Sequence, residues 1–413
     1  MFHILYLSHE GLTDPLGRSQ VLAYVLELAR RGYRFTVVSA EKPERYAAAR
    51  VEVEAAIGGL PVAWRPVPYT NRPPLVGPWR TLRRIERQAR ETCRTDPPDL
   101  LHCRSLLMAR IGQRLAGCGG VPWLYDMRGF WPDERAESGL WPPAHPLYGR
   151  LYRYFQAEEQ RLEREADHVM TLTDRARAIV LERTERPAEA VGVVPCCVDL
   201  EWMQASQPAR VGTLRHELGL TGRRPVIGYL GSLGGWYLAQ EMFACFAAWR
   251  AHQPLTFLVV TQDEAARVFA LAAGAGLAPE DVRVRAAGRA EVPDLVQLMD
   301  VGLFFIRPCY SKLASSPTKL AEFLAAGKPV VTLSGTGDLD AQLAGQPFAC
   351  VLCDTTPDEY ERAFAALPAL MTADPAGAHA FAAAHYSLAL GADRYAAAYQ
   401  RMLAAQDRHY ALR

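Results

Sequence analysis

Short apolar runs alternate with longer segments of mixed polarity along the first half of the chain. Residues 4–8 have the pattern of a buried strand, residues 19–31 that of a helix stopped by Gly32, and residues 35–39 that of the next strand. Short apolar strands separated by helices are typical of a parallel sheet, so the pattern predicts a doubly wound α/β domain. Further strands are expected at residues 61–67, 100–103, 123–126, 168–172 and 191–194.

The pattern is interrupted once and then begins again. A polar, proline-containing stretch from Asp199 to about Arg224 has the composition of a hinge, and a new strand follows at residues 225–231. Because 413 residues exceed what one hydrophobic core usually supports, we predict two domains. Further strands of the second domain are expected at residues 257–260, 282–285, 301–305 and 330–333.

The expected domain boundaries follow from this arrangement. The N-terminal domain is predicted at residues 1–200 and the C-terminal domain at residues 201–385. Tyr395 and Tyr399 are spaced as one face of a helix. Residues 386–413 are therefore predicted to form a terminal helix that packs back towards the hinge and the first domain.

Each half of the chain opens with a strand followed by a glycine-bearing turn. Ligands of open α/β sheets bind beyond the carboxyl ends of such strands, and glycine lets backbone N–H groups approach phosphate oxygens closely. Gly17 in the first turn, and Gly231 with Ser232 in the second, are therefore candidate phosphate-binding positions. Most such glycines only make a tight turn. Neither turn has the G-x-G-x-x-G pattern after its strand, which argues against a dehydrogenase.

Lysine is concentrated in one short segment. The 46 basic residues include only four lysines, and Lys312, Lys319 and Lys328 all lie within residues 307–331. Positive charge elsewhere is supplied almost entirely by arginine. This concentration indicates that the segment needs ammonium groups for a specific contact and not only for positive surface charge.

The same segment predicts a helix whose N-terminus suits a diphosphate. Ser315, Ser316 and Pro317 have the pattern of a helix start, and Lys319 and Glu322 follow on its first turns. Unpaired N–H groups and a partial positive charge at the helix N-terminus combine here with two hydroxyls and an ammonium group. Glu322 is then placed to accept hydrogen bonds from a ribose. The alternative is a capped surface helix that carries lysines by chance.

The run S-P-T-K-L-A-E-F-L-A-A-G-K-P-V-V at residues 316–331 resembles the donor-site segment of the retaining glycosyltransferases of family 4. That family has the GT-B architecture, in which two facing Rossmann-like, doubly wound domains enclose an interdomain cleft; the resemblance extends from residue 4 to about residue 405. It implies that Glu322 binds the nucleotide ribose. The residues implied to hold the rest of the donor are Lys312, Ser315, Ser316, Thr318 and Lys319.

The chain departs from the pattern of that family at several positions. Ala314 stands where many members have a glutamate that touches the donor sugar, which leaves Lys312 and Ser315 as the nearest polar candidates for this contact. A serine and Trp236 stand where many members have an arginine and a lysine that clamp the diphosphate. We therefore expect Lys319 to supply this positive charge.

A second segment has an aspartate and an arginine at the end of an expected strand. Asp126 and Arg128 lie there beside aromatic residues and a glycine turn, in a position that lines the cleft of an α/β protein. The resemblance puts this loop near the reacting sugar, so Arg128 is expected to stabilise the charge that develops on the leaving group. Asp126, Arg128 and Lys319 are the candidate catalytic residues, and His102 and His145 are candidates for the acceptor site. The alternative is an internal ion pair, Asp126–Arg128 or Asp133–Arg135, with Trp131 as a packing residue.

Five arginines are spaced three, four, three and four residues apart, as on one face of a helix. They are Arg80, Arg83, Arg87, Arg90 and Arg94. Such a stripe suits an anionic membrane surface, to which each charge contributes about 1 kcal/mol. The alternative is a solvated helix face partly balanced by Glu86 and Glu91. Because lipid-linked acceptors are common in the family that the chain resembles, the stripe is predicted to contact a membrane or the acceptor.

Composition narrows the remaining possibilities. A net charge of +1 argues against a general nucleic-acid-binding protein. Nine scattered cysteines indicate reduced thiols, and the single C-x-x-C at Cys350 and Cys353 lacks a second pair of metal ligands. The chain begins with a strand pattern and has no apolar run of about 18 residues. We therefore expect a cytoplasmic protein that associates peripherally with the inner face of the membrane.

These observations predict a retaining glycosyltransferase. It would move a sugar from a UDP- or GDP-linked donor to a cell-envelope polysaccharide or a lipid-linked acceptor. No cofactor and no metal are expected, because positive groups and helix N–H donors neutralise the diphosphate and no D-x-D pair stands in a donor loop. Two alternatives stay open: a nucleotide-sugar epimerase of the same fold, and a non-catalytic nucleotide-sugar-binding subunit.

Overall fold

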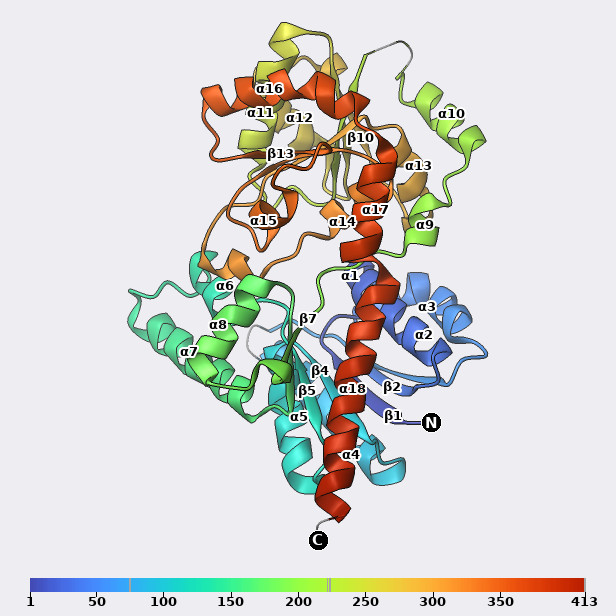
Figure 1. Ribbon diagram of the computed structural model, residues 1–413, viewed down its shortest axis with the longest axis vertical. Helices are drawn as coiled ribbons and strands as arrows, with labels where there is room; N and C mark the ends of the chain where they lie inside the picture. The colour runs from blue at the N-terminus through green and yellow to red at the C-terminus, as the bar shows by residue number, and fades with distance from the viewer. Residues whose placement is uncertain (74–75, 221, 223, 412–413) are drawn as a thin grey trace. The chain divides into compact units, whose positions relative to one another are not determined.

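The computed structural model describes residues 1–73, 76–220, 222 and 224–411, with side chains up to residue 406. The chain forms two compact units (Figure 1). Unit 1 comprises Met1–Pro195 together with the chain from Leu388 onward, and unit 2 comprises Cys196–Ser387. Each unit has its own parallel sheet with helices packed on it.

The sheet of unit 1 has seven strands in the order β3-β2-β1-β4-β5-β6-β7, and every pairing is parallel. All seven strands expected from the sequence are present; β1, β4, β5 and β6 are buried along their whole length, whereas the edge strand β3 is mostly exposed or half-buried. Their bounds are β1 His3–Ser8, β2 Arg34–Glu41, β3 Val62–Pro68, β4 Leu100–Arg104, β5 Trp123–Asp126, β6 His168–Thr171 and β7 Val191–Val193.

Helices connect these strands, as a parallel sheet requires. The helix expected at residues 19–31 begins as a π-helix at Arg18–Leu22 and continues as α2, Ala23–Arg30. The terminal helix α18, Leu388–Ala411, packs against α2 through buried Tyr395 and Tyr399, whereas residues 412–413 lie outside the described residues. The other helices are α1 Pro15–Gly17, α3 Pro43–Ile57, α4 Val76–Thr95, α5 Leu106–Gly119, α6 Trp131–Glu137, α7 Pro146–Glu165 and α8 Asp174–Thr184.

The sheet of unit 2 has six parallel strands in the order β10-β9-β8-β11-β12-β13. The sequence predicted the first five along the chain and missed β13, a four-residue edge strand with only two buried residues. Its four residues are all apolar, so the sequence has the pattern of a short strand here although none was predicted. The bounds are β8 Val226–Leu230, β9 Thr256–Val260, β10 Val282–Arg285, β11 Val301–Phe304, β12 Val330–Leu333 and β13 Ala349–Leu352.

The stretch expected to be a hinge is folded into unit 2. The described part of this stretch, residues 199–220, 222 and 224, includes two helices, and both pack on α13. Met203 and Leu214 from these helices are buried in the core of unit 2, so these helices belong to that unit although the composition of the stretch is polar. The helices of unit 2 are α9 Leu200–Gln204, α10 Pro208–Glu217, α11 Ala239–His252, α12 Ala265–Gly274, α13 Val292–Gln297, α14 Thr318–Ala325, α15 Leu339–Leu343, α16 Pro357–Thr372 and α17 Pro375–Tyr386.

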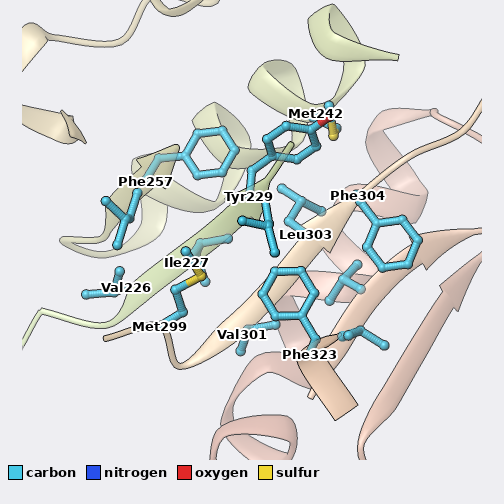
Figure 2. Close-up of a cluster of buried hydrophobic side chains, with 14 of the residues drawn as sticks. Val226, Ile227, Tyr229, Met242, Phe257, Met299, Val301, Leu303, Phe304 and Phe323 are labelled. Atoms are coloured by element: carbon cyan, nitrogen blue, oxygen red, sulfur yellow. The ribbon is translucent and has the colours of Figure 1, made fainter. Parts of the chain in front are cut away.

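Helix α14 is anchored to its sheet by an aromatic side chain. Phe323 is fully buried, and Figure 2 shows its ring beside Val301 of β11. Burial of a phenylalanine side chain contributes about 1.5–3 kcal/mol. This contact holds α14 on the sheet, and it thereby places Lys319 and Glu322, which lie on the same helix, at the carboxyl edge of the strands.

Candidate functional site

The N-terminus of α14 begins without a side-chain cap. Pro317 is its N-cap residue, and Thr318 is the first helical residue. The hydroxyl of Ser316 instead accepts a hydrogen bond of 3.1 Å from the N–H of Cys196. Ser315, Ser316 and Thr318 are half-buried in this loop and helix start. The structure therefore brings the predicted hydroxyls to a helix N-terminus, although none of them caps it.

Lys319 points into an aromatic enclosure. Its Nζ donates a 3.0 Å hydrogen bond to the hydroxyl of Tyr229 and lies 3.4 Å from the ring centroid of Tyr237. The Tyr229 hydroxyl in turn donates to the carbonyl of Ser232, the exposed residue predicted in the glycine turn. Tyr229 thus ties the amine of α14 to the loop that follows β8. Neither tyrosine was predicted as a site residue, because nothing in the sequence distinguishes them from aromatic residues that only pack in a core.

Gly231 allows the amine to reach this position. Its φ of +112° is one that side-chain-bearing residues rarely adopt, and a Cβ at this position would lie 3.4 Å from Nζ of Lys319. The amine therefore lies directly beside the turn at the carboxyl end of β8. Ligands of open α/β sheets bind at such turns.

Burial controls the protonation of this pair. Desolvation lowers the pKa of Lys319 well below its usual range, and the charge of Glu322 opposes that shift only in part. Burial also raises the pKa of Glu322, against the opposing effects of Arg289 and Lys319. No ion pair joins Lys319 to an acid among the described residues. A bound anion beside Nζ would therefore relieve a real electrostatic cost.

Two further basic side chains lie over the ring of Trp236. Nζ of Lys312 is 4.0 Å from a Trp236 ring centroid, and the guanidinium of Arg307 is 4.9 Å from it. The backbone N–H of Arg307 also donates to the carbonyl of Trp236. Ala314 is 1% exposed, so its side chain presents nothing to a ligand. Trp236, which replaces a basic residue of the family pattern, thus holds basic side chains in place by cation–π contact.

Unit 1 has a charged cluster at the carboxyl ends of its central strands. Asp126 is fully buried and accepts hydrogen bonds from Tyr395 at 3.0 Å and from Arg104 at 3.3 Å. Arg128 lies 3.4 Å from the same carboxylate, so the ion pair considered as the alternative is present. Burial alone would raise the pKa of Asp126, but Arg128, Arg104 and His102, whose Nε2 lies 3.4 Å from the carboxylate, together hold it well below its usual range.

Several side chains contact the guanidinium of Arg128. Besides Asp126, it approaches the Tyr395 hydroxyl and Oε1 of Gln20, both at 3.4 Å. Sequence reasoning missed Arg104, which is buried and pairs with Glu10 at 3.1 Å. The sequence could have indicated it, because Arg104 is the last residue of β4, as Asp126 is the last residue of β5, and both positions lie at the carboxyl edge of the sheet.

The two histidines proposed for an acceptor site have structural roles in unit 1. His102 is 1% exposed, and its Nδ1 lies 2.6 Å from the hydroxyl of Tyr399. His145 is the N-cap of α7, and its Nδ1 accepts hydrogen bonds from the N–H groups of Leu147 and Tyr148. A buried histidine and a helix cap are poor candidates for contact with an acceptor.

Gly17 is required by the path of the backbone. A Cβ at this position would lie 1.8 Å from the carbonyl oxygen of Gly11. The nearby N–H groups of Leu12 and Thr13 are already bonded to the buried carboxylate of Glu41, at 2.7 and 3.1 Å. These two amides are therefore occupied by an internal anion, and the glycine serves the tight packing of the turn.

The arginine stripe lies on α4 as expected. All five arginines are exposed, and Trp79 beside them is 55% exposed. Arg90 forms an ion pair of 2.9 Å with Glu86. The charge of this one arginine is therefore compensated, as expected for a solvated helix face. Within the described part of the chain, no helix is long and apolar enough to cross a membrane.

The described residues also contain no group of three or more histidine, cysteine or acidic side chains arranged to hold a metal ion. All nine cysteines are free thiols, with Cys350 buried and Cys353 exposed.

Residues 17–197 match the model of the glycosyl transferase 4-like domain. The fold of the whole chain is that of GT-B glycosyltransferases. No curated protein matches the sequence.

Three solved structures illustrate the likeness of the fold. Sucrose-phosphate synthase from Thermosynechococcus elongatus has a TM-score of 0.73 and 14% identity, over 98% of this chain and 100% of that one. Anabaena HepE in complex with UDP and glucose has a TM-score of 0.69 and 14% identity, over 96% and 98%. WaaG, a glycosyltransferase involved in lipopolysaccharide biosynthesis, has a TM-score of 0.65 and 17% identity, over 94% and 98%.

Proposed function

Because the chain carries a glycosyl transferase 4-like domain and has the fold of GT-B glycosyltransferases, we propose that it transfers a sugar from a nucleotide-diphosphate donor to an acceptor. The donor is UDP- or GDP-linked, the anomeric configuration is retained, and no metal ion takes part. The acceptor is a cell-envelope polysaccharide or a lipid-linked glycan. The observation that carries the proposal is the amine of Lys319, which is buried beside the glycine turn after β8 and forms no ion pair with an acid among the described residues.

The donor binds to unit 2 in this proposal. Its diphosphate lies against Lys319 and the uncapped start of α14, where N–H groups and the helix dipole favour negative charge. Glu322, one turn further along α14, accepts hydrogen bonds from the ribose. Lys312 and Ser315 are the nearest polar side chains for the sugar, since Ala314 offers none.

The acceptor binds to unit 1, and Arg128 stabilises the charge on the departing diphosphate. A preorganised cation of this kind costs no reorganisation during the reaction, which is why such groups are usually the largest catalytic contribution. Asp126 acts through Arg128: its ionised carboxylate, fixed by Tyr395 and Arg104, sets the position of the guanidinium.

The stripe on α4 places the enzyme on the inner face of an anionic membrane in this proposal. Attraction to such a surface sums over the exposed arginines and falls off within about 10 Å at 0.1 M salt. A cytoplasmic protein held in this way would meet a lipid-linked acceptor without spanning the bilayer.

The test is a transfer assay on the purified protein with UDP- and GDP-sugars and extracts of envelope lipids. We expect label to move to a lipid or glycan fraction, with unchanged activity in EDTA and a retained anomeric configuration by NMR of the product. Donor conversion in the absence of any acceptor would indicate an epimerase. Saturable donor binding without turnover in any combination would indicate a non-catalytic binding subunit.

A further inference from the structure

A groove lies between α4 and α5 on the surface of unit 1. Its volume is 490 Å³, and all the described residues that line it belong to these two helices. Arg83 and Arg90 line it from α4, and Arg110 and Arg114 line it from α5. The stripe recognised in the sequence is therefore one wall of a two-walled site, and the second wall comes from a helix whose arginines the spacing argument did not include.

One acidic residue organises part of this lining. Glu86 accepts hydrogen bonds from Arg90 at 2.9 Å and from both nitrogens of the Arg114 fork at 3.2 and 3.1 Å. Burial raises the pKa of Glu86, but these hydrogen bonds outweigh it and keep the carboxylate ionised. A single carboxylate thus holds two guanidinium groups at fixed positions across the groove, and positive charge remains in excess.

Arg110 is fixed in a different way. Its Nε lies 2.9 Å from Glu158, and one of its terminal nitrogens donates to the hydroxyl of Tyr154 at 2.9 Å, both on α7. Arg83, in contrast, has no ion pair among the described residues and lies over the ring of Trp79, 5.2 Å from its centroid. Arg83 is therefore the guanidinium in the groove that is best able to take an external anion.

The groove also has apolar walls. Leu82 and Leu107 are half-buried, Ile111 is 2% exposed, and Trp79 at one end is 55% exposed. Guanidinium groups bind phosphate in a forked, bidentate geometry, whereas aliphatic and indole surfaces favour a hydrocarbon chain. A ligand that uses both features is an amphiphile with an anionic phosphate head.

We propose that the groove between α4 and α5 binds one phospholipid molecule, with its phosphate at Arg83 and its acyl chain along Trp79 and Leu82. Charge complementarity alone would also admit nucleic acid or an acidic peptide, but neither partner needs the aliphatic wall. The site deepens the proposed membrane contact: it adds a discrete lipid position to the diffuse attraction of the stripe. It does not depend on the glycosyl-transfer step.

The experiment titrates the full-length protein with dihexanoyl phosphatidic acid, kept below the concentration at which it forms micelles, by isothermal calorimetry. We expect saturable binding of one molecule per chain. Arg83→Glu should weaken it roughly 10- to 100-fold, since it removes a charged hydrogen bond. Arg94→Glu is the matched control, because it makes the same charge change on the same helix outside the groove, and it should change the affinity less than about twofold.

A second variant tests the apolar wall. Trp79→Ala changes an exposed side chain, so the fold should persist, and it should weaken phosphatidic acid while leaving the weak binding of inorganic phosphate unchanged. Equal losses in Arg83→Glu and Arg94→Glu, or sedimentation with anionic vesicles without saturable binding of the monomeric lipid, would overturn the proposal and leave a diffuse surface. Displacement of the lipid by a polyglutamate peptide at comparable concentration would overturn it in favour of a peptide site.

Discussion

Lys319 makes a sharp prediction about the pH dependence of donor binding. In the free protein its amine is buried against Tyr229 and Tyr237, and desolvation holds its pKa well below the ordinary value of about 10.4. A diphosphate beside Nζ favours the charged amine and raises that pKa. Between the two pKa values the free protein is neutral at Lys319 and the complex is charged, so binding must take up a proton.

The sign and size of the effect follow from this linkage. Below the depressed pKa both states are protonated, and the affinity for UDP or GDP does not depend on this group. Above it, the affinity falls as pH rises, by up to about tenfold per pH unit, until the pKa of the complex is reached. The free energy of unfolding should change in the opposite sense: it should rise with pH over the window between the depressed pKa and about 10.4, because the unfolded chain binds one more proton than the folded chain.

Calorimetry in two buffers of different ionisation enthalpy measures the protons taken up when UDP binds. We expect up to one proton per nucleotide in the wild type at pH values above the depressed pKa. Lys319→Arg is the control, since a guanidinium stays charged and should bind UDP with no uptake from this position. If UDP binds to the wild type and the uptake equals that of Lys319→Arg across the pH range, the diphosphate does not contact Lys319.

Three further variants test the remaining assignments. Glu322→Ala should weaken binding of the nucleotide sugar roughly 10-fold, because a charged hydrogen bond to the ribose is lost, while an unchanged affinity in calorimetry would remove the ribose assignment. Arg128→Ala should lower kcat by about 10²-fold or more with little change in the affinity for UDP, and a loss confined to KM would refute a role in the chemical step. Changing Arg83, Arg87 and Arg90 together to Glu should abolish sedimentation with anionic vesicles and leave UDP affinity unchanged; vesicle binding equal to that of wild type would reduce the stripe to a solvated helix face.

Strands and sheet type could be predicted because their cause is local. A central parallel strand is buried on both faces, so its residues must be almost continuously apolar, as in β8 with Val226 and Ile227. The edge strand β13 has the same local signal, since Ala349–Leu352 is apolar throughout, although it was not predicted. The polar composition of residues 199–220 suggested a hinge, but a polar stretch needs only a few apolar anchors such as Met203 to fold onto a core.

The candidate donor residues were also visible in the sequence, since Lys319 and Glu322 follow a helix start, and one helix turn brings them to the same end of α14. Their environment was not visible. Tyr229 and Tyr237 belong to another part of the chain, and only the packing of α14 on its sheet brings their rings to the amine of Lys319. The same is true of the depressed pKa, which depends on the water excluded by those rings.

Helical spacing along α4 was enough to predict an exposed row of arginines, because periodicity is a property of one helix. It contained no information about Arg110 and Arg114, which α5 brings to the same groove. Likewise, Asp126 and Arg128 are two residues apart in sequence, but Tyr395 reaches them from the far end of the chain through α18. Neighbouring residues determine the periodicity of a helix or strand and which of its faces is buried. A site consists of side chains from distant segments, and which of them come into contact depends on how the helices pack against the sheets.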